Sequence, residues 1–167
     1  MSLQLEFIGH ACFRLWEDGK PTIVMDPYSP KEVQLEDDGT HLDADTVIVS
    51  SLTDTAHSNV GFVGGNPRVI NALNVTAGKE SATINGEALV PIATAEAPDH
   101  DLHTPMDNAM YAFKAGGLWF AHLGDLGYGL GEEELAPWTG KCDVLMAIVG
   151  EKNTVKLDDL EPMIEFL

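Results

Sequence analysis

Short apolar segments, each followed by a cluster of Gly, Pro, Asn or Asp, run along this chain and limit it to folds built largely from strands. Near the amino terminus, residues 3–7 alternate between apolar and polar, and similar segments follow at residues 11–15 and 22–25. Residues 18–21, which separate the last two segments, have the composition of a tight turn. The sequence therefore predicts that three antiparallel strands open the fold.

The segment at residues 45–50 differs from the others because Val47, Ile48 and Val49 are consecutive and apolar. Such a run is typical of a strand buried on both faces. Acidic residues begin two expected helices, at residues 132–136 and 157–166. Further strands are expected at residues 68–71, 82–84, 88–93, 109–114, 118–122 and 143–149. Many strands with few helices between them favour a mixed α/β or α+β architecture of packed sheets.

No repeat or linker divides the 167 residues, so we expect a single domain over residues 1–167. The chain has no apolar run near the ~20 residues of a membrane-spanning helix. It also lacks a basic start followed by an apolar core, so no signal peptide is expected and a cytoplasmic location is predicted. Cys12 and Cys142 both lie in apolar stretches, and we expect buried thiols rather than a disulfide.

The chain is strongly acidic, with 27 acidic residues against nine basic ones and a formal net charge of −18. Such a surface repels phosphate backbones and anionic lipids, which argues against nucleic-acid and membrane partners.

Two familiar kinds of site do not match the sequence. The glycines between residues 124 and 131 lack the spacing of a dinucleotide fingerprint, and the glutamates at 132–134 would compete with a phosphate for the helix that follows. No Gly-x-Ser-x-Gly motif supports a serine hydrolase.

Histidines and carboxylates follow two of the expected strands. Asp54 and His57 come after residues 45–50, and His122 and Asp125 flank the end of residues 118–122. Loops at strand ends often present catalytic groups. Imidazole together with carboxylate suits zinc, manganese or iron, whereas carboxylates alone suit magnesium or calcium. The ordinary alternative, polar residues that are solvated or hydrogen-bonded near a turn, stays open at this point.

Four motifs, in order and over most of the chain, resemble those of the metallo-β-lactamase-fold hydrolases, and most closely the branch similar to ascorbate-6-phosphate lactonase. They are FIGHACF (7–13), VMDPY (24–28), HSNV (57–60) leading to GGNPRVI (64–70), and HLGDLG (122–127) followed by CDVL (142–145). The resemblance implies an α+β fold, a four-layer αββα sandwich, with a metal site at the edge between two sheets.

The chain departs from this family at its metal-binding motif, H-x-H-x-D-H. When His57 is aligned with the last histidine, the earlier positions fall on Leu52, Asp54 and Ala56. A further family histidine falls on or near Glu96, and Asp125 matches the aspartate that bridges metals. The resemblance places the last family histidine on a strand beyond residues 157–166, and the sequence stops at Leu167, which leaves two alternatives: the chain is truncated relative to its relatives, or this ligand and its strand are absent by nature.

The resemblance therefore implies an oxygen-rich set of metal ligands: Asp54, His57, Glu96 and Asp125. These residues suit one divalent metal of the manganese, iron or magnesium type better than a zinc pair, or they bind no metal at all. Asp125 and His57 are the expected catalytic residues. Secondary candidates for the site are His10, Asp26, His100, His103 and His122. For His10 and Asp26 the structural alternative is a histidine at a strand break and an aspartate that caps the turn before Pro27.

Two functions of different classes follow. The first is a metal-dependent hydrolase of a small phosphorylated or lactone/ester substrate, with an altered metal site. The second is a catalytically inactive scaffold, a binding or assembly protein that has lost tight metal binding. A third expectation is a homo-oligomer in which a partner subunit completes the site, because a missing strand leaves a sheet edge open to pairing.

Overall fold

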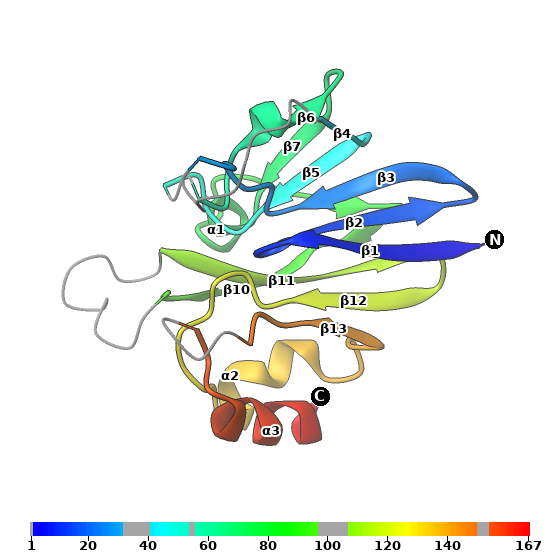
Figure 1. Cartoon of the computed structure of the whole chain (residues 1–167). Helices are drawn as coiled ribbons and strands as arrows, with labels where there is room; N and C mark the ends of the chain where they lie inside the picture. The colour runs from blue at the N-terminus through cyan, green and yellow to red at the C-terminus, as the bar shows by residue number, and fades with distance from the viewer. Residues whose placement is uncertain (1, 32–40, 54–55, 97–106, 150–153) are drawn as a thin grey trace. The chain divides into compact units, whose positions relative to one another are not determined.

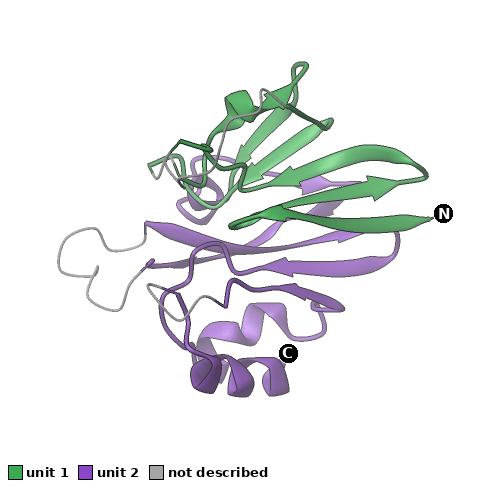
Figure 2. Cartoon of the chain, viewed as in Figure 1, with its two compact units in different colours: residues 1–71 green, residues 72–167 purple. Residues whose placement is uncertain are grey.

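The computed structural model describes residues 2–31, 41–53, 56–96, 107–149 and 154–167 (Figure 1). The chain forms two compact units, Met1–Asn71 (unit 1) and Ala72–Leu167 (unit 2) (Figure 2). Each unit contains its own mixed sheet, and the described residues contain few helices, so the fold is α+β. None of the described helices is long and apolar enough to cross a membrane.

Unit 1 contains a five-stranded sheet in the order β1-β2-β3-β5-β7, together with a two-stranded ribbon of β4 and β6. The first three strands are antiparallel, which confirms the predicted opening, and β3, β5 and β7 are parallel. The elements of unit 1 are β1 (Leu3–Gly9), β2 (Cys12–Glu17), β3 (Lys20–Met25), β4 (Leu42–Asp43), β5 (Thr46–Val49), the 3-10 helix η1 (Val60–Phe62), β6 (Val63–Gly64) and β7 (Arg68–Asn71).

Strand β5 is the buried strand that the sequence predicts. It pairs with β3 on one side and β7 on the other, and Val47, Ile48 and Val49 are fully buried. Because β1, β3 and β5 all point the same way, the turn after β1 and the segments after β3 and β5 lie at one edge of the sheet. We call this the carboxyl edge of unit 1, and it carries the histidines described below.

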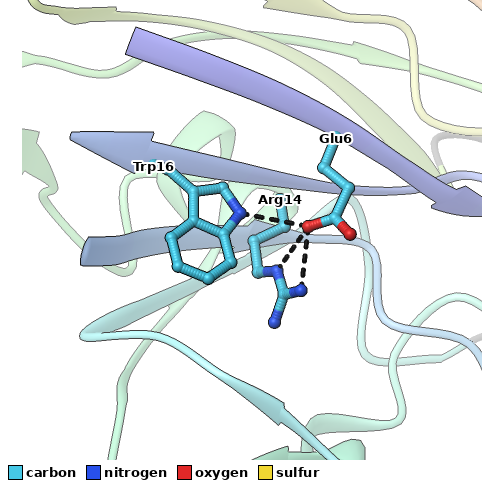
Figure 3. A network of polar contacts seen from close by, with 3 residues as sticks. All are labelled: Glu6, Arg14 and Trp16. Carbon is cyan, nitrogen blue, oxygen red and sulfur yellow. Dashed lines mark hydrogen bonds and ion pairs between the residues drawn. The ribbon is translucent and has the colours of Figure 1, made fainter. Parts of the chain in front are cut away.

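A polar network joins the edge strand β1 to its neighbour β2 (Figure 3). Glu6 on β1 accepts hydrogen bonds at Oε2 from Arg14 Nε (2.9 Å) and Trp16 Nε1 (3.0 Å), both on β2. Arg14 also forms an ion pair with the same oxygen at 2.8 Å, and its guanidinium carbon lies 4.7 Å from the centre of the Trp16 ring. The network connects β1 to β2 through side chains as well as through the backbone.

Unit 2 contains a four-stranded sheet in the order β10-β11-β12-β13, antiparallel except for the parallel pair β12 and β13. Its core surrounds Trp138, which is fully buried and donates a hydrogen bond from Nε1 to the Val90 carbonyl (2.9 Å). The elements of unit 2 are α1 (Ala72–Thr76), β8 (Thr83–Ile84), β9 (Glu87–Ala88), β10 (Val90–Thr94), β11 (Asn108–Ala115), β12 (Leu118–His122), α2 (Glu132–Leu135), the 3-10 helix η3 (Ala136–Trp138), β13 (Val144–Met146) and α3 (Leu157–Phe166).

Several elements differ from the sequence prediction. Helix α1 is not predicted, because its five residues are too few to show a helical period. The expected strand at residues 88–93 is two strands, since β9 pairs with β8 and β10 pairs with β11. The break is at Leu89, whose backbone N–H bonds to the Ala82 carbonyl (3.0 Å). Both cysteines are free as expected, although Cys142 is only half-buried.

Candidate functional site

His57 lies in the segment that leaves β5 at the carboxyl edge of unit 1. His57 is buried, with 4% of its surface exposed. Two hydrogen bonds from Asn59 hold this segment to the chain that follows β3: the backbone N–H bonds to the Pro27 carbonyl (2.8 Å), and Nδ2 bonds to the Tyr28 carbonyl (3.2 Å). The predicted ligand His57 is therefore fixed against the end of a neighbouring strand.

His10 lies in the turn between β1 and β2 and stacks on His57. The ring centres are 4.4 Å apart and the ring planes differ by 20°. His10 is exposed and has a backbone φ of 55°, a left-handed conformation that favours glycine. The sequence places these histidines 47 positions apart, and only the sheet brings them into contact.

Asp26, directly after β3, is fully buried and connects β3 to the end of β5. Its carboxylate accepts hydrogen bonds from the Ser50 backbone N–H (2.6 Å) and from Ser50 Oγ (2.5 Å). The backbone N–H of Asp26 in turn bonds to the Ile48 carbonyl (3.0 Å). Asp26 therefore fixes the start of the segment that leads to His57. The role of Ser50 has no signal in the sequence, because a serine after a strand is common.

Cys12 begins β2 near this edge, and its thiol is fully buried. Burial raises the pKa of its thiol far above the ordinary value, and the negative charge of Asp26 raises the pKa further. A backbone hydrogen bond from Tyr28 and the charge of Arg14 oppose this only in part. The thiol is therefore protonated at neutral pH, whereas metal binding and nucleophilic attack need the thiolate.

In unit 2, His122 ends β12 and is fully buried. Its Nδ1 atom accepts a hydrogen bond from the Gly124 backbone N–H (2.7 Å), and its ring stacks on Tyr111 with ring centres 5.2 Å apart. These contacts shape the turn that leads to Asp125. The structure thus gives this secondary candidate a local role in the loop after β12.

Glu96 and Asp125 lie on loops that begin at one edge of the unit 2 sheet. The backbone N–H of Glu96 bonds to Asp107 Oδ1 (3.0 Å), and that of Asp125 bonds to Asn108 Oδ1 (3.1 Å). The Gly127 N–H bonds to the carbonyl of residue 95 at 3.4 Å, which joins the two loops. Both carboxylate-bearing residues are half-buried, so their side chains are accessible.

Asn108 organises this edge, a role that the sequence does not predict. Its Nδ2 donates to Thr94 Oγ1 (2.8 Å) and to the Leu123 carbonyl (3.2 Å), while its Oδ1 holds Asp125. The side chain is 1% exposed and connects the ends of three neighbouring strands. A polar residue at the start of a strand carries no distinctive sequence signal, although it follows Asp107 directly and precedes a run of apolar residues.

The structure brings part of the predicted site together in each unit. His10, Asp26 and His57 share the carboxyl edge of unit 1, and Glu96 and Asp125 share adjoining loops of unit 2. Asp54, His100 and His103 lie outside the described residues. Within the part of the chain that the structure describes, no group of three or more His, Cys, Asp or Glu side chains could hold a metal ion. The four-residue ligand set therefore stays a prediction.

Leu52 falls at the position that the sequence resemblance assigns to the first family histidine. It is 49% exposed, and its side chain has no donor atom for a metal. Ala56, at the position of the family aspartate, brings no donor atom in its side chain. These two positions are the clearest departures from the H-x-H-x-D-H motif.

Comparison with known proteins points to one family. The sequence model of the family described as "Beta-lactamase superfamily domain" matches residues 4–167. No curated protein sequence matches the chain. Among solved structures, a proposed Zn-dependent hydrolase of the metallo-β-lactamase superfamily from Thermotoga maritima is similar, with 28% identity, a TM-score of 0.67, and coverage of 99% of this chain and 71% of that one.

Two more distant structures share the fold. A proposed metal-dependent hydrolase from Parabacteroides distasonis has 19% identity and a TM-score of 0.51, and the match covers 73% of this chain and 60% of that one. A proposed metal-dependent hydrolase from Veillonella parvula has 13% identity and a TM-score of 0.57, with 98% and 80% covered. At these identities the similarity concerns the fold alone.

Proposed function

The chain belongs to the beta-lactamase superfamily domain family, and from this membership we propose that it is a metal-dependent hydrolase with an altered metal site. The observation that carries the proposal is the family match over residues 4–167. The similarity to the proposed Zn-dependent hydrolase of Thermotoga maritima over nearly the whole chain supports it. The four-layer αββα sandwich and the lactonase-like branch stay predictions from the sequence resemblance.

The donor atoms of the chain suit one divalent cation. His57 offers one buried imidazole, and Glu96 and Asp125 offer accessible carboxylates, with Asp54 as the fourth predicted ligand. Oxygen donors with a single imidazole suit manganese, iron or magnesium better than a zinc pair. When bound, such a cation acts as a Lewis acid toward a carbonyl or phosphoryl oxygen and lowers the pKa of a water.

Other residues of the chain hold the predicted metal ligands in place. Asp26 and Asn59 hold the backbone on either side of His57, at Ser50 and at Asn59 itself. Asn108 and Asp107 do the same for the loops of Asp125 and Glu96 through their backbone N–H groups. We propose His57 and Asp125 as the residues that bind the cation and face the substrate.

The substrate that we propose is a small phosphorylated molecule or a lactone or ester. Both classes present an oxygen that a cation can polarise and a bond that water can break. The acidic surface favours the uncharged lactone or ester, because an anion is repelled unless the bound cation offsets the carboxylates. Cytoplasmic location and self-association are expectations of the sequence that we retain as proposals.

Metal content tests this proposal. The protein is purified without chelators, washed in concentrated sodium chloride to remove cations held loosely by the acidic surface, and analysed for manganese, iron, zinc and magnesium. We expect about one divalent metal per chain, lost in Asp125→Ala and in His57→Ala. Glu133→Ala is the matched control, because it removes an exposed carboxylate on α2. Hydrolysis of an aryl phosphate and of a simple lactone is then compared among the same proteins.

A second candidate function has its own support. Leu52 and Ala56 remove two family ligands, and the described residues contain no group of three donors, which favours a scaffold without catalysis. A washed protein that contains no metal and is not stabilised by manganese, iron or zinc contradicts the hydrolase and supports the scaffold. Metal that remains equally in Asp125→Ala, His57→Ala and Glu133→Ala also contradicts the proposed ligands.

A further inference from the structure

We propose that His10 is a positioning residue that holds the imidazole of His57 in one orientation. The proposal rests on the proposed function, in which His57 binds the metal, and it adds the residue that sets the direction of this ligand. The contact that carries it is the stack between the two rings, with centres 4.4 Å apart and planes within 20° of each other. Stacked rings resist rotation, because turning one ring moves its edge into the other.

Burial makes the contact one-sided. His57 is 4% exposed, whereas His10 is exposed, so His10 covers His57 from the outside of unit 1. The buried surroundings of His57 already restrict where its side chain can lie. On the solvent side of the His57 ring, the stacked ring of His10 is the group that limits its rotation.

The backbone under His10 is held in a conformation that it does not prefer. Its φ is 55°, and the preceding Gly9 has a φ of 150°, which only glycine adopts readily. A side chain at Gly9 would meet the Tyr28 ring at 3.5 Å. Tyr28 also accepts the hydrogen bond from Asn59, two residues after His57. The turn of His10 and the segment of His57 therefore pack against the same residue, and this surrounding structure keeps the unusual backbone in place.

The ring geometry also decides between two roles for His10. A metal ion bound by a histidine lies in the plane of its ring, along the nitrogen lone pair. Two nearly parallel rings separated by a stacking distance have no point that lies in both planes close to both nitrogens. His10 therefore does not share a metal ion with His57 in this arrangement. Its contribution is to orient the neighbouring ring, as groups around a metal ligand commonly do.

Three variants of His10 test the proposal. His10→Gly suits the left-handed backbone and removes the ring, His10→Asn removes the ring but keeps a side chain tolerated at positive φ, and His10→Phe keeps a ring without nitrogens. Asn85→Gly is the matched control, because it changes a non-glycine residue at positive φ (51°) in unit 2. Circular dichroism and melting temperature show which variants fold.

Two readouts are taken. The first is the carbon–proton NMR signals of the His57 ring in metal-free protein, and the second is the affinity for manganese. We expect His10→Gly and His10→Asn to shift and sharpen the His57 signals and to weaken manganese binding by about tenfold. His10→Phe and Asn85→Gly retain the wild-type values in both readouts.

The outcomes separate this proposal from the proposed function. Unchanged His57 signals in folded His10→Gly and His10→Asn overturn the positioning role, whatever the metal does. If His10→Phe loses as much manganese affinity as His10→Gly, the positioning role is also overturned, because a stacked ring alone then does not hold His57. A wild-type protein that binds no manganese counts against the proposed function, while the NMR signals of metal-free protein still decide the role of His10.

Discussion

At the scale of single residues, His10 and Asp26 have left-handed backbones beside the candidate site. Their φ values are 55° and 41°, and such conformations cost about 1–2 kcal/mol for residues other than glycine. Histidine and aspartate are among the residues that tolerate this region. Each is held by a contact with the segment after β5: His10 by stacking on His57, and Asp26 by bonding to Ser50. Beside the candidate site, each unusual backbone is therefore accompanied by a contact that connects neighbouring strand ends.

Replacing Asp26 should show how much this connection contributes. In Asp26→Ala, the Ser50 N–H and hydroxyl lose their partner in a place where Ser50 is only 3% exposed. Each buried donor without a partner costs about 1–3 kcal/mol, so we expect a loss of about 3 kcal/mol or more. Ser50→Ala removes the hydroxyl bond alone and should cost about 1–2 kcal/mol. Urea denaturation of both variants measures the difference.

Asp26→Asn is the conservative control for this prediction. Asparagine tolerates the left-handed backbone and keeps one oxygen for the Ser50 N–H, so the free energy of unfolding should fall between the wild-type and Asp26→Ala values. If Asp26→Ala proves no less stable than Ser50→Ala, Asp26 does not hold the end of β5.

At the scale of elements, the sequence predicts those strands whose side-chain pattern is local. The alternation of β1 and the apolar run of β5 are visible in single segments, and α3 is found at its predicted residues. Short elements are missed, because α1 and the ribbon of β4 and β6 have too few residues to show a period. The contacts of the site are missed for another reason: stacking of His10 on His57 depends on strand order, which no local pattern specifies.

The network of Glu6, Arg14 and Trp16 predicts that the pairing of β1 and β2 depends on pH. The pKa of Glu6 is lowered from its ordinary 4.5, mainly by the Trp16 hydrogen bond, with burial opposing this and Arg14 adding to it. A carboxyl whose pKa is lowered on folding stabilises the fold above its unfolded pKa, and this contribution is lost as pH falls through the folded value. The stabilisation is therefore present at neutral pH and is lost progressively as the pH falls below the ordinary glutamate pKa of 4.5.

Glu6→Gln measures this contribution. Because the Glu6 side chain is 35% exposed, solvent screens the pair, and we expect a loss of only about 0.5–1 kcal/mol at neutral pH. The difference between wild-type and Glu6→Gln should shrink as the pH approaches about 3. Glu133→Gln, on the exposed face of α2, is the control and should show no such convergence. A constant difference across this pH range contradicts the role of the charge.

At the scale of the whole molecule, the predicted ligands come from both halves of the sequence. His57 belongs to unit 1, and Glu96 and Asp125 belong to unit 2. The family resemblance gives the sequence positions of these ligands. Measuring which substitutions release a bound cation shows how many of them act together. The acidity of the chain bears on the same point, since carboxylates that are close together repel each other unless a cation lies between them.

The net charge of −18 also predicts that salt stabilises the protein. Like charges 4 Å apart repel by about 1 kcal/mol in water, and screening shortens from about 30 Å at 0.01 M salt to about 3 Å at 1 M. Screening the repulsion of a few such pairs should raise the melting temperature by about 2–4 °C for each kcal/mol relieved, over this range of sodium chloride.

Glu161 and Glu165 are exposed on α3 with helical i, i+4 spacing, and the second lies near the carboxyl end, where the helix dipole disfavours an acid. Replacing both with glutamine should raise the melting temperature in low salt and reduce the gain from added salt. A melting temperature that responds to neither change shows that self-repulsion does not limit the stability of this fold.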